Sequence, residues 1–314
     1  MRNRLVTIFG GTGFIGRHLV RRLARRGVRI RVFSRRPDLA GHLQPMGQVG
    51  QIVVERIDLS DDAALREGQA GAFATFNLIG ILYETRRQKF AEVHGALPGR
   101  IARAAAASDV QRVVHISAIG ADPQASAAYA RSKAEGERQV REGFAAASIM
   151  RPSIVVGPED QFFNRFAEMA RLSPVLPLIG GGHTRFQPVW VGDVADALVA
   201  ALERDDAPGT TYELGGPKVY TFAELLRYML EVIGRRRLLL PVPFAVAELQ
   251  ARVLELLPVP PLTRDQVELL KVDNVVHEGM PGLAELGVTP TPIELVVPDY
   301  LQRYRAVPLR RAHL

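Results

Sequence analysis

A glycine-rich turn close to the start of the chain constrains the fold more than any other feature of the sequence. The turn, Gly10-Gly-Thr-Gly-Phe-Ile-Gly16, follows an apolar run at residues 5–9 and opens a segment with helical spacing at residues 14–26. This order places free backbone N–H groups at the positive end of a helix, where a diphosphate binds. Three glycines are expected to serve the tight turn, the approach of the diphosphate and the close helix–strand packing: Gly10, Gly13 and Gly16.

The rest of the first half alternates short β-rich runs with helical stretches. We expect strands at residues 5–9, 28–33, 52–57, 73–79, 110–116 and 147–150, and helices at residues 14–26, 88–107 and 125–142. Such alternation predicts an α/β fold with a Rossmann-type, doubly wound parallel sheet.

Beyond Arg151-Pro152 the alternation breaks up and prolines become frequent. We therefore expect an NAD(P)-binding Rossmann domain at residues 1–150 and a smaller α/β substrate-side region at residues 151–314, packed on it. Two runs of the second region, residues 188–191 and 211–214, are predicted to return to the main sheet as strands.

The end of the second strand indicates which dinucleotide binds. An NAD site usually carries a carboxylate there, about 20 residues past the glycines, to bond the ribose hydroxyls. Here the strand ends in Phe33-Ser34-Arg35-Arg36 and has no carboxylate. An arginine would hold a 2′-phosphate through charge-assisted hydrogen bonds, so the sequence favours NADPH, although both arginines could also be solvated loop residues.

Two further segments follow strands at the edge of the sheet where ligands bind. Asp58 and Leu59 come after the third strand, where the carboxylate could meet the adenine amino group or could simply cap a turn. Asn77-Leu78-Ile79-Gly80 ends the fourth strand and could border the cofactor.

Three polar side chains suggest proton-transfer chemistry near the nicotinamide. Tyr129 and Lys133 are four residues apart on one helix face, and Ser117 ends the fifth strand just upstream. The lysine charge would lower the pKa of the tyrosine, which would exchange a proton with a carbonyl or carbinol that the serine orients. A Tyr-x-x-x-Lys pair alone is also common on exposed helices.

Composition excludes several classes of site. The chain has no cysteine, so disulfides, thiolate metal sites and cysteine nucleophiles are ruled out, and its seven histidines lack metal-ligand spacing. The net charge is +7, and all but four of the 40 basic residues are arginine. This reflects either a coding bias or a basic face for an anionic partner such as acidic lipid. Scattered arginines without an aromatic platform argue against nucleic acid.

A segment in the second region could contact a membrane or a partner. Residues 244–257 carry apolar side chains at helical spacing (246, 249, 253, 256 and 257) and follow the basic run Arg235-Arg-Arg237. The stripe could be buried in the protein's own core, or it could form an interfacial docking helix near anionic lipid. No apolar run is long enough to span a bilayer, and residues 1–9 carry no signal-peptide pattern.

Together these residues resemble the extended and atypical branches of the short-chain dehydrogenase/reductase superfamily. Val189-Trp-Val-Gly-Asp193 and Leu214-Gly-Gly-Pro217 are similar to that branch's downstream elements, and Arg151-Pro-Ser153 is similar to the segment that lies along the nicotinamide. The resemblance and the motifs give this set of expected cofactor contacts: Gly10, Thr12, Gly13, Phe14, Ile15, Gly16, Ser34, Arg35, Arg36, Asp58, Leu59, Leu78, Ile79, Gly80, Ser117, Lys133, Pro152 and Ile154.

A narrower resemblance covers nearly the whole chain, from about Arg4 to about Tyr300. The sequence resembles the NADPH-binding accessory subunit of respiratory complex I and its bacterial relatives. The motifs that carry this resemblance are Leu43-Gln-Pro-Met-Gly47, Asn77-Leu-Ile-Gly80, Pro158-Glu-Asp-Gln-Phe-Phe-Asn-Arg-Phe166, Phe186-Gln-Pro188 and Leu262-Thr-Arg-Asp-Gln-Val267. It implies a tightly held NADPH, other complex I subunits as partners, and a peripheral place on the cytoplasmic face of a bacterial inner membrane or on the matrix side in mitochondria.

Two functional hypotheses follow. In the first, the chain is such a subunit, and its NADPH acts mainly as a structural ligand. In the second, it is a stand-alone NADP-dependent reductase or epimerase that uses Ser117, Tyr129 and Lys133. Only eleven residues separate Ser117 from Tyr129, whereas active relatives usually have a longer loop there, which favours the first hypothesis.

Overall fold

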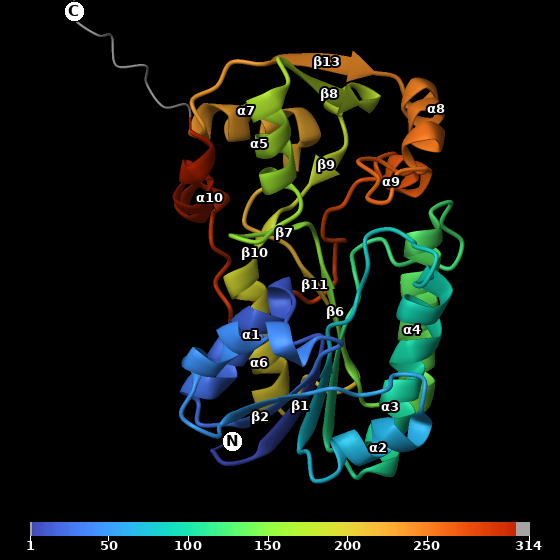
Figure 1. Ribbon diagram of the computed structural model, residues 1–314, viewed down its shortest axis with the longest axis vertical. Helices are drawn as coiled ribbons and strands as arrows, with labels where there is room; N and C mark the ends of the chain where they lie inside the picture. The colour runs from blue at the N-terminus through green and yellow to red at the C-terminus, as the bar shows by residue number, and fades with distance from the viewer. Residues whose placement is uncertain (1, 306–314) are drawn as a thin grey trace, which may run out of the picture.

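The computed structural model describes residues 2–305, and its larger layer is a seven-stranded sheet with helices on both faces (Figure 1). The strand order is β11-β6-β5-β4-β1-β2-β3, and every pairing is parallel. This confirms the predicted α/β class. The strands are β1 (Leu5–Phe9), β2 (Arg29–Phe33), β3 (Ile52–Glu55), β4 (Ala74–Asn77), β5 (Arg112–Ile116), β6 (Ser148–Pro152) and β11 (Thr211–Leu214).

Five helices cover this sheet. Helices α1 (Phe14–Arg25) and α6 (Val191–Glu203) pack together on one face, whereas α2 (Asp62–Gln69), α3 (Leu97–Ala107) and α4 (Ala128–Gly143) cover the other. Fully buried side chains such as Phe76 and Leu198 fill the layer beneath α1 and α6. Each such side chain contributes about 1.5–3 kcal/mol through the area that it removes from water. The sequence reading missed α2, whose N-cap is Asp61.

The predicted helix at residues 88–107 is present without a break from Phe90 to Ala107, but its winding changes along its length. Its first part is a π-helical turn, η3 (Ala91–Ala96), and α3 begins at Leu97. A Cβ at Gly136 of α4 would lie 1.9 Å from the carbonyl oxygen of His94, so η3 and α4 meet there backbone to backbone. A π turn widens the helix and redirects the side chains that it carries, and such turns are frequent at functional sites.

Apart from β11 and α6, the described residues of the second region form three two-stranded sheets and five α-helices (Figure 1). The prediction that residues 211–214 return to the main sheet is confirmed, whereas the prediction for residues 188–191 is wrong, because β10 pairs with β7 instead. Residues 306–314 of the predicted region 151–314, like Met1, lie outside the described residues. The elements are β7 (Val155–Val156), α5 (Phe163–Leu172), β8 (Val175–Ile179), β9 (Arg185–Phe186), β10 (Val189–Trp190), β12 (Tyr220–Thr221), α7 (Phe222–Val232), β13 (Leu238–Val242), α8 (Phe244–Leu254), α9 (Arg264–Leu269) and α10 (Ile293–Leu301).

Two elements of the second half belong to the main-sheet layer. Strand β11 is its edge strand, paired with β6, and helix α6 packs against α1. The predicted boundary at residues 150/151 is therefore not respected in space, because β11 and α6 follow it in the sequence but belong to the main-sheet layer. Helices α5, α7 and α10 surround a separate core that includes Phe163 and Phe222, whereas α8 and α9 pack in a smaller cluster with Ile179 and Val242.

No helix between residues 2 and 305 is both long enough and apolar enough to span a bilayer. Over the same residues, no three His, Asp or Glu side chains gather closely enough to hold a metal ion.

Candidate functional site

The glycine turn joins the carboxyl end of β1 to the first turn of α1. Gly10 has a φ of +83°, which side chains other than glycine rarely adopt. A Cβ at Gly16 would lie 2.4 Å from the carbonyl oxygen of Gly10, so helix and turn can approach only without a side chain there. Gly13 is the N-cap of α1, receives no side-chain cap, and has only the carbonyl oxygen of Gly10 near its position. The turn thus forms a cradle of backbone N–H groups with room for an anion.

The end of β2 carries the residues expected at the ribose. Ser34 accepts a hydrogen bond from the N–H of Arg36, at 3.2 Å, and Arg36 pairs loosely with Asp38, at 3.5 Å. Arg35 is exposed and forms no hydrogen bond or ion pair with any residue from 2 to 305. Arg35 is therefore an exposed guanidinium without a partner among residues 2–305.

Asp58 already has a structural role. Its carboxylate accepts hydrogen bonds from the N–H of Ser60, at 2.8 Å, and from the Ser60 hydroxyl, at 2.6 Å, and these bonds lower the pKa of Asp58. Asp58 thus caps a turn, as one of the two interpretations of the sequence expected. Its contact with the adenine amino group stays a prediction. Leu59 is half-buried and packs in the cluster that contains Phe9 and Phe33.

The segment after β4 lies between the glycine turn and the polar triad. A Cβ at Gly10 would touch the backbone of Leu78 at 3.0 Å, so these two backbones are in contact. Ile79 is half-buried, and its N–H donates to the Asn77 side chain. A Cβ at Gly80 would lie 3.6 Å from Nε2 of His94 and 3.7 Å from Nζ of Lys133. Leu78 to Gly80 therefore connect the two ends of the site.

The structure brings Ser117 and Lys133 into one buried environment. Lys133 donates to the carbonyl oxygen of Ile116, at 3.3 Å, and burial lowers its pKa to about 8. Ser117 is buried, and its Oγ has no hydrogen-bond partner among the described residues. A buried hydroxyl without a partner costs about 1–3 kcal/mol, which a ligand with a polar group would recover. The unpartnered hydroxyl and the glycine cradle both fit a dinucleotide.

Tyr129 differs from the sequence expectation. Lys133 Nζ lies 5.8 Å from the centre of the tyrosine ring, yet the pKa of Tyr129 is raised to about 12, by burial first and by the Asp265 carboxylate second. The expectation that the lysine charge lowers this pKa is therefore wrong. Phe90 and His94 both contact the tyrosine ring edge-on. Tyr129 thus holds its proton in a mainly aromatic environment.

Two residues of the site were not found from the sequence. His94 accepts a hydrogen bond from the N–H of Ile81, at 3.0 Å, and contacts the Ser132 hydroxyl, at 3.2 Å. Asp265 accepts from the N–H groups of Ala128, at 2.5 Å, and Tyr129, at 3.0 Å. The N-cap of α4, Ala127, offers no side-chain cap, so Asp265 caps this helix from 136 residues away. No local pattern signals either contact.

Pro152 and Ile154 lie where the chain leaves the main sheet. Pro152 ends β6, and its carbonyl oxygen accepts from the N–H of Ile119, at 3.1 Å. The N–H of Ile154 donates to the side chain of Asn274, at 3.1 Å, which also bonds Ser153. These contacts hold residues 152–154 beside the loop that follows Ser117. This is the position expected for a segment that lies along the nicotinamide.

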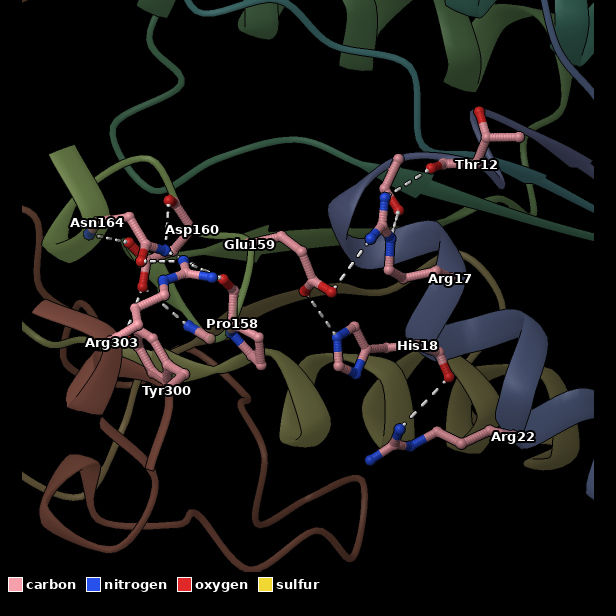
Figure 2. Close-up of polar contacts among 12 residues, drawn as sticks. Thr12, Arg17, His18, Arg22, Pro158, Glu159, Asp160, Asn164, Tyr300 and Arg303 are labelled. Carbon is pink, nitrogen blue, oxygen red and sulfur yellow. Dashed lines mark hydrogen bonds and ion pairs between the residues drawn. The ribbon is translucent and has the colours of Figure 1, made fainter. Parts of the chain in front are cut away.

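The same segment continues to the phosphate end of the site. Figure 2 shows Glu159 reaching from the loop before α5 to two side chains of α1. Its Oε1 is 3.1 Å from Arg17 Nη1, and its Oε2 is 3.3 Å from His18 Nε2. Arg17 also donates to the carbonyl oxygens of Thr12 and Gly13, at 3.3 Å each. Glu159 is thus linked directly to the glycine turn.

Comparison with known proteins defines the class. The profile of the NAD dependent epimerase/dehydratase family matches residues 6–215, and the chain belongs to this family. Among solved structures, the fold is similar to UDP-glucuronic acid 4-epimerase from Bacillus cereus in complex with UDP-glucuronic acid and NAD. The TM-score is 0.67 and the identity is 17%, over 95% of this chain and 99% of that one.

The curated relatives are more specific. The chain is 37% identical, over 305 residues, to the mitochondrial NADH dehydrogenase (ubiquinone) 1 alpha subcomplex subunit 9 of Rattus norvegicus, which covers 96% of this chain and 80% of that protein. The subunit of the same name from Arabidopsis thaliana is 35% identical over 313 residues, with 96% and 78% coverage. The chain belongs to the same group of the family as these subunits.

Proposed function

We propose that this chain is an NADPH-binding accessory subunit of a complex I-type NADH:quinone oxidoreductase and that its nucleotide is mainly a structural ligand. The observation that carries the proposal is the similarity to NADH dehydrogenase subunits over 96% of the chain. A ligand that binds only the folded state stabilises that state by mass action, by about 2.7 kcal/mol at 100 times its dissociation constant.

Purification from membranes tests the assembly. A tagged chain, recovered after gentle solubilisation of membranes from its native host, should bring other subunits of the oxidoreductase with it, and mass spectrometry identifies them. The matched control is the same tag on an unrelated soluble protein. Recovery of the chain as a free monomer without any such subunit contradicts the proposal.

The choice of NADPH over NADH rests on Arg35. This exposed guanidinium follows β2, and the residues 33–36 contain no carboxylate to bond a ribose hydroxyl. Arg35→Ala should weaken NADPH binding by roughly tenfold or more while changing NADH binding little, because a lost charge-assisted bond is worth about 1.5–3 kcal/mol. Arg36→Ala is the control, since Arg36 already pairs with Asp38. Tighter binding of NADH than of NADPH by the unaltered chain contradicts this choice.

A structural role for the nucleotide also fits the state of Tyr129. With its pKa raised to about 12, the hydroxyl is a poor base near neutral pH, whereas a general base works best with a pKa near the working pH. The intact Ser117, Tyr129 and Lys133 set nevertheless supports one alternative, a stand-alone NADP-dependent reductase or epimerase. That alternative requires NADPH turnover with a carbonyl substrate and loss of the turnover in Tyr129→Phe.

We further propose that the second region contacts an anionic membrane surface. The apolar side chains predicted for a docking helix at residues 244–257 are all exposed, although α8 ends at Leu254. They are Val246, Leu249 and Val253 on α8 and Leu256 and Leu257 just after it, and these five are here called the α8 apolar face. Helix α8 packs on the protein through Ala247 and Ala251 instead. The basic run at residues 235–237 precedes β13, which leads into α8. Arg236 is exposed, whereas Arg235 and Arg237 are half-buried and donate to backbone carbonyl oxygens. A cationic side chain thus accompanies exposed apolar ones in one continuous segment, the combination that anionic bilayers attract.

Vesicle flotation tests the contact. The chain should float with vesicles that contain anionic phospholipid and should float less with neutral vesicles or at high salt. Leu249→Glu should reduce flotation several-fold. Val49→Glu is the control, because Val49 is fully exposed but lies before β3 in the main-sheet layer, outside the second region. Equal flotation of both variants contradicts a specific contact. A membrane contact of this kind corresponds to a peripheral position on the cytoplasmic face of a bacterial inner membrane.

A further inference from the structure

Two segments that are about 140 residues apart in the chain meet at the first turn of α1. The contacts are those of Glu159 with Arg17 and His18, here called the Glu159 bridge (Figure 2). Arg17 occupies the centre of this arrangement, because its guanidinium also donates to the carbonyl oxygens of Thr12 and Gly13. The bridge therefore connects the second region to the turn whose N–H groups face the diphosphate.

The loop that carries Glu159 is fixed by hydrogen bonds to the next residue, Asp160. Asp160 is buried and accepts hydrogen bonds from the N–H groups of Gly157, Phe162 and Asn164. It also accepts from the hydroxyl of Tyr300 on α10, at 2.6 Å. A carboxylate with four donors fixes the loop that carries it, so the Glu159 side chain reaches α1 from a preorganised base.

The segment before Glu159 passes directly over the start of α1. A Cβ at Gly157 would lie 3.1 Å from the ring of Phe14 and 2.7 Å from Val191, so only a glycine fits between them. Upstream, Pro152 and Ile154 are the residues that we expect along the nicotinamide. We therefore expect residues 152–159 to run along the cofactor from its nicotinamide end to its diphosphate. The Glu159 bridge attaches the end of this segment to α1.

We propose that the Glu159 bridge retains the nucleotide by slowing its release. The inference rests on the proposed function, in which the dinucleotide is a long-lived structural ligand. Glu159 is negatively charged and cannot attract a diphosphate itself, so it acts as a positioning residue through Arg17 and the covering segment. Opening the bridge removes the contacts that hold this loop against α1, so the loop, which Asp160 keeps folded as one unit, can move away from the N-terminal turn of α1 and the nucleotide then leaves.

The chain offers a matched control at the other end of the same helix. Arg26, the C-cap residue of α1, pairs with Glu203 at 3.1 Å, the same distance as Arg17 to Glu159, and the two glutamates are similarly exposed, at 42% and 34%. Partly exposed ion pairs of this kind contribute little to folding stability. Glu159→Ala and Glu203→Ala should therefore have nearly the same melting temperature without nucleotide, so a difference in nucleotide release is not a folding effect.

Stopped-flow fluorescence measures the release of bound NADPH into an excess of NADP⁺. Glu159→Ala should release NADPH roughly three- to tenfold faster than the unaltered chain, the range expected for one ion-pair network of this exposure. Glu159→Gln, which keeps the shape but not the charge, should be intermediate and serves if the alanine variant does not fold. Glu203→Ala should stay within about twofold of the unaltered chain.

Three outcomes overturn the inference in distinguishable ways. Unchanged or slower release in both Glu159 variants refutes the bridge while leaving the nucleotide site intact. Equal acceleration in Glu203→Ala shows that any ion pair on α1 has the same effect and also refutes it. Failure of the unaltered chain to bind NADPH in an equilibrium titration refutes the proposed nucleotide site, and the bridge with it.

Discussion

Acidification should destabilise this protein through two buried histidines beside Lys133. Burial first and the Lys133 charge second lower the pKa of His94 to about 2 and that of His115 to about 3. Both imidazoles are about 1% exposed, and Nε2 of His115 has no partner among the described residues. The folded protein therefore keeps both rings neutral in mild acid, whereas the unfolded chain protonates them.

The sign and size follow from proton linkage. Above pH 6.5 neither state binds a proton at these rings, so they contribute nothing to pH dependence. Below pH 6.5 the unfolded state binds one proton per ring that the folded state does not, and the free energy of unfolding falls by about 1.4 kcal/mol per pH unit per ring. At pH 5 the loss is about 2 kcal/mol for each histidine and about 4 kcal/mol for both, a large part of a typical stability of about 5–15 kcal/mol.

Urea unfolding at pH 7.5, 6 and 5, followed by tryptophan fluorescence, measures this loss. His115→Gln should lose about 2 kcal/mol less than the unaltered chain between pH 7.5 and pH 5, because one of the two rings is absent. His42→Gln is the control, since His42 is exposed, and it should lose as much as the unaltered chain. If His115→Gln loses stability as steeply as the control, His115 is not held neutral in the folded state and the reasoning fails.

Two substitutions test the glycine turn and the cap of α4. Gly16→Ala should destabilise the protein by about 3 kcal/mol or more and abolish nucleotide binding, because its Cβ would lie 2.4 Å from the carbonyl oxygen of Gly10. Thermal unfolding measures the loss of stability and titration with NADPH measures the loss of binding. Normal NADPH binding by this variant would contradict the packing argument. Asp265→Ala should lower the free energy of unfolding by about 1–2 kcal/mol, because two N–H groups of α4 lose their acceptor. It should also lower the pKa of Tyr129, measured by ultraviolet titration, because a nearby negative charge is removed. An unchanged Tyr129 pKa would contradict the assigned contact.

The elements that could be predicted from the sequence are those with local causes. The glycine turn, its flanking strand and helix, and the parallel sheet follow from short-range patterns that the structure confirms. A local pattern also located α8, whose apolar stripe had two interpretations, and the structure leaves that stripe exposed. What an apolar stripe contacts depends on the rest of the fold, so periodicity alone could not decide between burial in the core and an exposed docking surface.

The features that were missed depend on distant contacts. The π turn at residues 91–96 lies where η3 and α4 meet at Gly136, and the sequence of this segment carries no signal of it. Asp265 caps α4 across 136 residues of chain. The raised pKa of Tyr129 depends on burial and on the Asp265 carboxylate, which the spacing of Tyr129 and Lys133 does not reveal. Of residues 188–191 only Val189 and Trp190 form a strand, and it pairs in a small sheet instead of the main one.

The late position of β11 and α6 in the chain has a consequence for biosynthesis. While the ribosome is still adding residues beyond 150, β6 has an unpaired edge, and the apolar surface that Val194, Leu198 and Leu202 of α6 later cover is open to water. Unpaired strand edges and open apolar surface promote association between nascent chains. The nucleotide-binding half should therefore need protection by chaperones until Leu214 has left the exit tunnel, and a fragment that stops at residue 150 should aggregate when expressed alone.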